Sequence, residues 1–264
     1  MLGPHPRGPE TQSCGRSRYV PALPADNPFL DPLYVDHLRE TYADFPELLD
    51  AYVNGSWGAV GSSDKVFSAE LVADAMKRQR EPGTPVQWGV DVARFGDDRT
   101  VVYERRGMAT PRLLAVWTKQ DTRTTSDKLV ALYRAAAVRP EAICVDDIGV
   151  GGGVTDNLKS AGLPVRGINV GEAACEADKF FNKHAELAWH LRSMLEDGGC
   201  LPNDEHVRSE LTAFRYTVRS GRIAVEAKDE LKRRLGCSPD YADALILAFA
   251  PEQRSVFDYY RRFA

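Results

Sequence analysis

Four aspartates stand where hydrophobic segments of the sequence become acidic, and together they have the chemistry to hold a divalent metal ion. Asp91 lies within the hydrophobic stretch VQWGVDVA, and Asp146 ends the stretch AICVD. Asp240 and Asp243 are three residues apart in SPDYADALILAF, so both carboxylates would share one face of a helix. An unpaired buried carboxylate is costly, so such a group is usually neutralised, hydrogen-bonded or bound to a cation. Oxygen ligands of this number suit Mg²⁺ or Mn²⁺, and a pair of such ions supports displacement at a phosphodiester.

Interpretations without a metal remain open for these acids and their neighbours. Asp91 alone could be a core carboxylate that accepts hydrogen bonds from backbone N–H groups. Asp240 could be only a first-turn acid that the helix dipole keeps ionised. Asp147 should point to solvent, because the side chains of successive strand residues alternate. Asp97 and Asp98 are expected to be turn residues, with Asp98 at most a supporting group of the site.

Two further sequence features, a glycine run and a pair of histidines, say less about the function. The glycine run GVGGG at 149–153 resembles a phosphate-binding loop, but a bare glycine run can equally serve only to permit a turn. His184 and His190 are six residues apart on a predicted helix and do not share a face, so they are not expected to be ligands.

The predicted elements around the aspartates define a mixed sheet. Three consecutive strands with short turns come first, and helices and strands then alternate, which requires parallel pairing and covering helices. The strands are predicted at 86–93, 100–104, 113–118, 142–146 and 165–169, and the helices between the later strands at 126–138 and 154–161. This is the order of an α/β, ribonuclease H-like mixed sheet, in which three antiparallel strands precede parallel strands and helices flank the sheet. Its first strand is central and its fourth lies beside it, so Asp91 and Asp146 are expected to be neighbours.

The C-terminal part supplies the second pair of acids and a concentration of positive charge. Helices are predicted at 182–196 and 239–250, with a hairpin turn at 220–221 between them. Ser238 is expected to cap the last helix and Pro239 to take its first position, and small alanines should let this helix lie close on the sheet. Six cations are candidate contacts to nucleic-acid phosphates, although they could also form an ordinary solvated surface. They are Arg219, Arg222, Lys228, Lys232, Arg233 and Arg234.

Composition limits the class of protein. The 264 residues, 43% of them hydrophobic, indicate a soluble globular chain, and the net charge of −4 weighs against a DNA partner without excluding it. No run approaches the ~20 apolar residues of a membrane span, and no signal peptide is recognised, so a cytoplasmic protein without a membrane partner is expected. The five scattered cysteines are expected to be free thiols. Four segments are predicted: a disordered tail at 1–18, a helical lead-in or linker at 19–84, a ribonuclease H-like domain at 85–252 and a C-terminal tail at 253–264.

Four stretches in this order resemble the nuclease domain of the large terminase subunit of tailed phages. They are WGVDVARFGDDRTVV, VDDIGVGGGVTDNL, FFNKHAELAWHLRSML and SPDYADAL. The upstream stretches RSRYVPALPADNPFLDPLYVDHL and YVNGSW are similar to the segment that follows the ATPase domain in that family. The resemblance therefore covers residues 19–251.

The resemblance implies an endonuclease that cuts concatemeric viral DNA during genome packaging in the bacterial cytoplasm. It implies two Mg²⁺ or Mn²⁺ ions held by Asp91, Asp146 and the Asp240/Asp243 pair. Double-stranded DNA is the implied substrate, and the portal and the small terminase subunit are the implied partners. The chain has no G-x-x-x-x-G-K-[ST] sequence, so no ATP-driven motor activity is expected, and a fragment, a split gene product or a prophage remnant is expected instead.

Three alternatives remain. A RuvC-type junction resolvase would use the same acids on branched DNA, and an actin-like nucleotide-binding protein of the same superfamily would need a second related domain. A docking module without catalysis is the third.

Overall fold

The computed structural model describes residues 23–42, 46–55, 65–93 and 98–252. The chain forms two compact units, Met1–Ser63 and Asp64–Ala264. The tails expected at 1–18 and 253–264, and Asp97, lie outside the described residues. No helix in the described ranges is both long enough and apolar enough to span a bilayer.

The first unit is helical. It contains the short helix η1 (Pro24–Asp26) and the helices α1 (Tyr34–Thr41) and α2 (Pro46–Asn54). The rings of Tyr42 and Tyr52 stack with centroids 5.2 Å apart, which joins the end of α1 to α2. These helices lie within the segment expected to be a helical lead-in.

A five-stranded mixed sheet forms the centre of the second unit, in the order β3-β2-β1-β4-β5. Its strands are β1 (Val86–Asp91), β2 (Arg99–Arg106), β3 (Arg112–Thr118), β4 (Ala142–Asp146) and β5 (Val165–Ile168). β1 and β3 are antiparallel to β2, whereas β4 runs parallel to β1 and β5 parallel to β4. The predicted ribonuclease H-like arrangement, with β1 central and β4 beside it, is confirmed.

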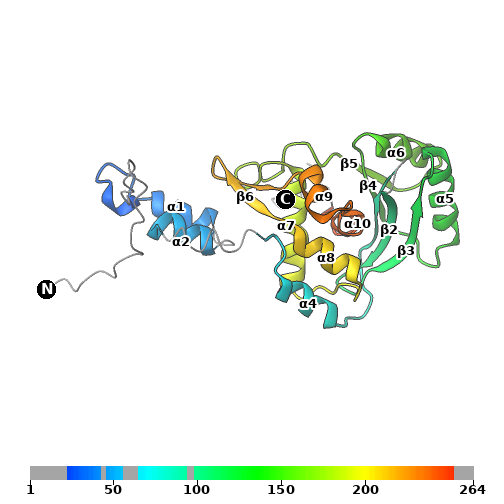
Figure 1. Ribbon diagram of the computed structural model, residues 1–264, viewed down its shortest axis with the longest axis horizontal. Coiled ribbons are helices and arrows are strands. Elements are labelled where there is room, and N and C mark those ends of the chain that lie inside the picture. The colour runs from blue at the N-terminus through cyan, green and yellow to red at the C-terminus, as the bar shows by residue number, and fades with distance from the viewer. Residues whose placement is uncertain (1–22, 43–45, 56–64, 94–97, 253–264) are drawn as a thin grey trace, which may run out of the picture. The chain divides into compact units, whose positions relative to one another are not determined.

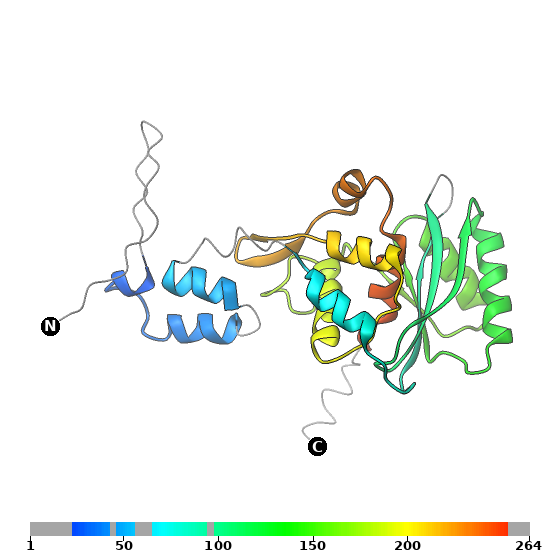
Figure 2. The ribbon, with the colours of Figure 1, turned by 60° about the horizontal axis from the view of Figure 1, so that its bottom comes forward.

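Helices cover both faces of this sheet, as Figure 1 and Figure 2 show. One face carries α5 (Thr122–Ala135) and α6 (Val150–Ser160). Against the other face lies α10 (Asp240–Ala248), and beyond it are α4 (Ala69–Lys77), α7 (Lys183–Glu196) and α8 (Glu205–Ala213). The hairpin of β6 (Tyr216–Arg219) and β7 (Arg222–Val225) turns at 220–221 as predicted, and α9 (Lys228–Leu235) leads from it to α10.

Alternation along β1 decides which helical layer each side chain meets. Trp88 and Val90 belong to a hydrophobic cluster with residues of α5 and α6. Gly89 and Asp91 therefore point to the opposite face, where α10 lies. A Cβ on Gly89 would lie 2.1 Å from the carbonyl oxygen of Ala244 and 2.2 Å from the backbone nitrogen of Ala248. The predicted close approach of the small residues of α10 is thus confirmed, and it depends on a glycine in the strand.

The C-terminal end of α10 is held by two polar side chains from the sheet. The last carbonyl groups of a helix have no partner within it. Gln87 Nε2 donates to the carbonyl oxygens of Leu247 at 3.2 Å and Ala250 at 3.0 Å. Arg166 donates to the carbonyl oxygens of the two residues that follow the helix cap, Ala250 at 3.2 Å and Pro251 at 2.7 Å. The sheet therefore fixes α10 along its axis.

Several predicted boundaries are wrong. α5 begins at Thr122, four residues earlier than predicted, because Asp121 caps it by accepting the N–H of Thr124 at 2.7 Å. α6 begins at Val150, so Gly149, with φ of 62°, makes the turn and the later glycines are helical. The structure therefore fits the interpretation that the glycine run serves to permit a turn.

Two features of the second unit were not predicted. Residues 65–84, expected in the lead-in, lie within this unit: Val66 and Phe67 are fully buried, and Lys65 forms an isolated β-bridge with Arg215. The helix α8 is also new, and Asp204 caps it by accepting the N–H groups of two following residues. Four cysteines in the described ranges are free thiols, as expected.

Candidate functional site

Asp91 and Asp146 end two adjacent parallel strands at the same edge of the sheet. Val90 pairs with Val145 in the register of β1 and β4, so the next residue of each strand is one of the two aspartates. Asp91 is only 4% exposed, whereas Asp146 is partly buried and accepts the N–H of Ile148 at 3.1 Å. Asp147 is exposed, as the alternation predicts. The sheet thus brings the two predicted acids together.

The two acids of α10 have different partners. Asp240 is 2% exposed, and its Oδ2 accepts the backbone N–H of Arg99, at the start of β2, at 2.7 Å. Asp243 Oδ2 instead lies 2.7 Å from the ammonium nitrogen of Lys228. Asp240 therefore ties α10 to the sheet, and Asp243 is the one that shares a counter-ion with Asp91.

That counter-ion is Lys228, the first residue of α9. Its Nζ lies 3.4 Å and 3.3 Å from the two carboxylate oxygens of Asp91, in addition to its contact with Asp243. Burial lowers the pKa of Lys228, but Asp243 and Asp91 outweigh burial and hold this pKa well above its ordinary value. Sequence analysis proposes Lys228 as a phosphate contact, whereas the structure places its ammonium group among the acids. Because 137 residues separate Lys228 from Asp91, no local pattern could indicate this pair.

One ammonium group does not neutralise the acids. The pKa of Asp91 is raised to about 8, chiefly by burial; Lys228 opposes this rise, and Asp243, Asp240 and Asp146 contribute to it. Burial also raises the pKa of Asp146, although the N–H of Ile148 and the charge of Lys228 oppose this. The three other predicted acids therefore all act electrostatically on Asp91, so the site favours additional positive charge.

The donor set suits a hard divalent cation, but the side chains are not yet arranged around one. Within the described ranges, no three side chains of His, Cys, Asp or Glu converge closely enough to hold a metal ion as they stand. The Lys228 ammonium lies where a cation between Asp91 and Asp243 would bind. Asp91, Asp146 and Asp243 are therefore the residues that could hold a metal once the side chain of Lys228 moves away.

The predicted N-cap of α10 is wrong. α10 begins at Asp240 with Pro239 as its N-cap, and Ser238 Oγ is buried without a hydrogen-bond partner among the described residues. Glu210 of α8 supplies a cap instead, because its Oε2 accepts the N–H of Ala242 at 2.8 Å. The pKa of Glu210 is raised to about 8, chiefly by burial, and the charge of Asp240 contributes to this rise. Sequence analysis missed this acid together with its helix.

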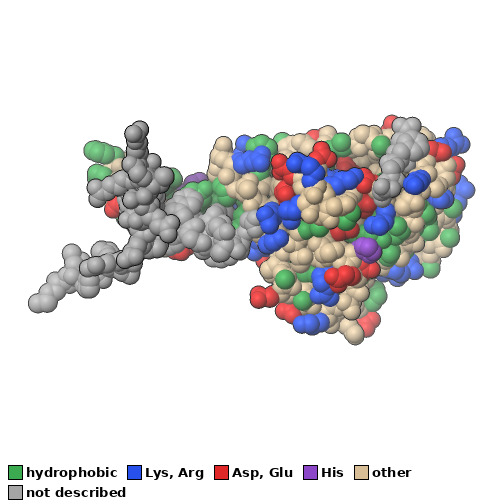
Figure 3. All heavy atoms as spheres, viewed as in Figure 1, with side chains coloured by type: hydrophobic (Ala, Val, Ile, Leu, Met, Phe, Trp, Pro, Cys, Tyr) green, Lys and Arg blue, Asp and Glu red, His purple; other side chains and the backbone are tan. Residues whose placement is uncertain are grey.

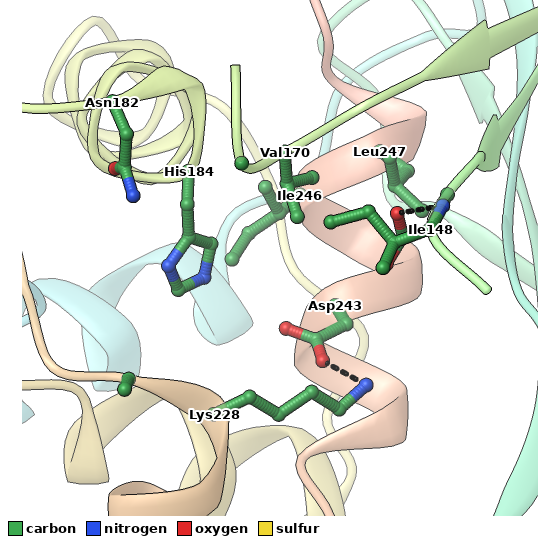
Figure 4. A pocket seen from close by; sticks show the side chains of 11 residues that line it. Ile148, Val170, Asn182, His184, Lys228, Asp243, Ile246 and Leu247 are labelled. Atoms are coloured by element: carbon green, nitrogen blue, oxygen red, sulfur yellow. Dashed lines mark hydrogen bonds and ion pairs between the residues drawn. The ribbon is translucent and has the colours of Figure 1, made fainter. Parts of the chain in front are cut away.

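A cavity of about 190 Å³ opens beside the acids, as Figure 4 shows. Its polar lining includes Asp146, Asp243 and Lys228, together with His184 at the start of α7. Burial lowers the pKa of His184, and Lys228 lowers it further against the effect of Asp243, so the imidazole is neutral at pH 7. Sequence analysis did not expect His184 to be a ligand. The feature of the sequence that could have drawn attention to His184 is Asn182, whose side chain caps α7 and which therefore places His184 in the first turn of that helix.

The six predicted phosphate contacts have different surroundings. Besides Lys228, Lys232 pairs with Asp98 at 2.6 Å, and Arg234 pairs with Glu226. The Arg222 guanidinium lies 5.2 Å from the ring centroid of Phe181, and Arg219 and Arg233 are exposed. Figure 3 shows side chains of both signs next to one another over the region of α9. The positive charge is therefore interleaved with negative charge and does not form a uniformly basic surface.

The fold is shared with solved nuclease domains of phage terminases. The nuclease domain of the large terminase subunit of bacterial virus Sf6, a mutant with manganese and beta-thujaplicinol, matches with a TM-score of 0.63 and 18% identity, covering 71% of this chain and 99% of that chain. Another mutant structure of that subunit, with calcium, matches with a TM-score of 0.62 and 20% identity over 71% of this chain and 100% of that chain. The large terminase nuclease of thermophilic phage G20c matches with a TM-score of 0.52 and 20% identity over 71% of this chain and 98% of that chain.

These matches confirm at the level of fold the resemblance that the sequence motifs carry. No protein-family model matches the chain, and no curated protein matches it in sequence.

Proposed function

We propose that this chain is a metal-dependent endonuclease that cuts double-stranded DNA during packaging of a phage genome. The observation that carries the proposal is that Asp91 and Asp243 share one lysine, Lys228, at the end of the strand next to Asp146, and that this lysine does not fully offset the raised pKa of Asp91. The fold that positions these acids is that of terminase nuclease domains. Cutting of concatemeric DNA, two metal ions, a portal and a small terminase subunit as partners, and action in the host cytoplasm belong to the same proposal.

The three aspartates would hold Mg²⁺ or Mn²⁺. When bound, such ions lower the pKa of an attacking water and stabilise the charge of the leaving oxygen. Asp91 and Asp146 approach from the ends of β1 and β4, and Asp243 approaches from α10. Asp240, through its bond to Arg99, keeps α10 in place. This division of roles favours Asp243 over Asp240 as the ligand from this pair.

Lys228 would have two roles in succession. It neutralises part of the acid cluster before a metal binds, through its contacts with Asp91 and Asp243. Its side chain is 41% exposed, so the ammonium group can swing towards solvent without unfolding α9. There it can contact a DNA phosphate, as can Arg219 and Arg233. The ion pairs of Lys232 and Arg234 would have to open for those two side chains to bind phosphate.

A junction resolvase would use the same acids, but none of the observations favours branched DNA. An actin-like protein needs a second related domain, and the described residues contain one sheet of this type. Unbranched duplex DNA is therefore the substrate that we propose.

The decisive experiment is cleavage of plasmid DNA by the purified chain with Mn²⁺, Mg²⁺ or chelator. Asp91→Asn and Asp146→Asn should each abolish cleavage, whereas Asp147→Asn, which changes an exposed neighbour, should retain it. Cutting that persists in chelator, or a wild-type rate in either of the first two variants, would refute the proposal. A four-way junction as a second substrate tests the resolvase.

A further inference from the structure

The cavity beside the acids has a second, apolar wall that metal binding does not use. Ile148, Val170 and Ile246 line this wall, and Asp146, Asp243 and His184 line the polar side. In Figure 4 the three aliphatic side chains lie together, and His184 and Asn182 extend from the start of α7 on the opposite side of the cavity. The site therefore continues beyond the carboxylates.

The wall that contains Val170 is held in place by the start of α7. The N–H of His184 donates to the carbonyl oxygen of Val170 at 2.9 Å, and the N–H of Lys183 donates to that of Glu172 at 2.8 Å. Further along the same loop, the carboxylate of Glu186 accepts the N–H groups of Cys175 at 3.1 Å and Glu176 at 2.9 Å. A ligand would meet a wall that is already ordered, which reduces the entropy cost of binding.

The volume of the cavity limits its occupant. About 190 Å³ is far more than a single water molecule needs. It is less than the roughly 300–1,000 Å³ of pockets that bind drug-sized ligands. One small ring system fits, and two stacked rings do not. Ile148, which lines the cavity, is 49% exposed, so a ring from solvent can reach this wall.

The polar side chains of the cavity offer both donors and acceptors, so they can hydrogen-bond the edge of a bound ring. The neutral imidazole of His184 offers one donor and one acceptor. Asn182 accepts the N–H of Ala185 at 3.0 Å through Oδ1, so its Nδ2 can donate into the cavity. A nucleobase has an apolar face and an edge with donors and acceptors, and in DNA it is joined through its sugar to a phosphate.

We propose that this cavity binds one nucleoside of the cleaved strand, next to the phosphate held at the acids. The face of the base lies against Ile148, Val170 and Ile246, and its edge is hydrogen-bonded by His184 and Asn182. A base within a duplex cannot enter such a cavity, so this nucleoside must leave the stack, as in enzymes that read an extruded base. The inference rests on the proposed nuclease function for the position of the phosphate.

The test uses the full chain with ¹³C-labelled Ile and Val methyl groups and the nucleoside thymidine as probe. Thymidine has no phosphate, so it needs neither metal nor cleavage to bind. We expect it to shift the methyl signals of Ile148, Val170 and Ile246 in NMR spectra, and we expect inorganic phosphate not to shift them. Unchanged methyl signals at the highest soluble thymidine concentration would overturn the proposal.

A matched pair of variants gives a second measurement. Val170→Phe fills the cavity, and Val138→Phe makes the same change at a valine that is 41% exposed and lies before the opposite end of β4. We expect Val170→Phe to weaken thymidine binding and to lower kcat/KM for DNA cleavage, each at least about tenfold. Val138→Phe should leave both unchanged. Equal behaviour of the two variants would refute the subsite.

The outcomes separate this inference from the proposed function. If the chain cuts DNA and thymidine leaves the methyl signals unchanged, the subsite is refuted and the nuclease stands. If thymidine binds at these methyl groups and no DNA is cut under any metal condition, the nucleoside site stands and the nuclease is refuted.

Discussion

Replacement of Asp91 by asparagine tests the electrostatics of the site without any substrate. Burial and the neighbouring acids raise the pKa of Asp91 from 3.8 to about 8. An acid whose pKa is raised in the folded state takes up a proton on folding at every pH between these two values. Its contribution to folding is therefore least unfavourable below pH 4, and stability falls as the pH rises towards 8.

The size of the effect follows from the same pKa. At pH 7 the folded protein keeps Asp91 largely protonated, whereas the same side chain would be ionised in the unfolded chain. Protonating it at pH 7, about three pH units above its ordinary pKa, costs about 1.4 kcal/mol per unit, so the upper limit of the cost to folding is about 4 kcal/mol. Asparagine has the same shape and no charge, but it weakens the contact with Lys228. We therefore expect Asp91→Asn to be about 1–3 kcal/mol more stable than wild type at pH 7.

The assay is urea unfolding in the presence of chelator at pH 5, 6 and 7.5. The stability gain of Asp91→Asn should increase with pH, because wild type loses stability over this range and the variant lacks the titrating group. Asp147→Asn, which alters an exposed acid next to Asp146, should show no gain. A gain that is absent, or that decreases as the pH rises, would refute the description of Asp91 as a buried and crowded acid.

Three further predictions follow from other contacts. Lys228→Ala removes the cation that competes for the acids, so Mn²⁺ should bind at least about tenfold more tightly in titration calorimetry without DNA; weaker binding would show that the lysine does not compete. Gly89→Ala should lower the free energy of unfolding by about 3 kcal/mol or more, because the added Cβ meets the backbone of α10, whereas Gly83→Ala has open space and should cost less than about 1 kcal/mol by urea unfolding. Arg233→Ala should lower the magnitude of the log–log salt slope of duplex binding by about 0.9, and Arg134→Ala, on α5, should not; equal slopes would place the DNA elsewhere.

The sheet and two of the acids could be predicted because their signals are local. Hydrophobic runs of strand length mark β1 and β4, and an aspartate at the end of each run is visible without a structure. Their parallel adjacency is predicted once the order of elements is identified as that of a ribonuclease H-like sheet. The position of α10 was also accessible, since its alanines indicate a helix that lies close on another layer.

The rest of the site depends on contacts between distant parts of the chain. The ion pairs of Lys228 and the cap that Glu210 gives to α10 join residues far apart in the sequence, so no periodicity reveals them. Ser238 was assigned as the cap because its residue type and position suit that role, but Pro239 occupies the N-cap and an acid from α8 supplies the hydrogen bond. Tertiary structure overrode a local preference here.

The way α10 is anchored bears on how inactivating alleles should be interpreted. Gln87 and Arg166 hold one end of this helix and Glu210 holds the other, and a helix of nine residues is about 13 Å long. Loosening either end displaces the whole element, including the carboxylate of Asp243. A genetic screen for lost cleavage would therefore collect alleles at these three anchors as readily as at the acids. If every position at which a substitution abolishes cleavage were taken as a catalytic residue, the size of the active site would be overestimated.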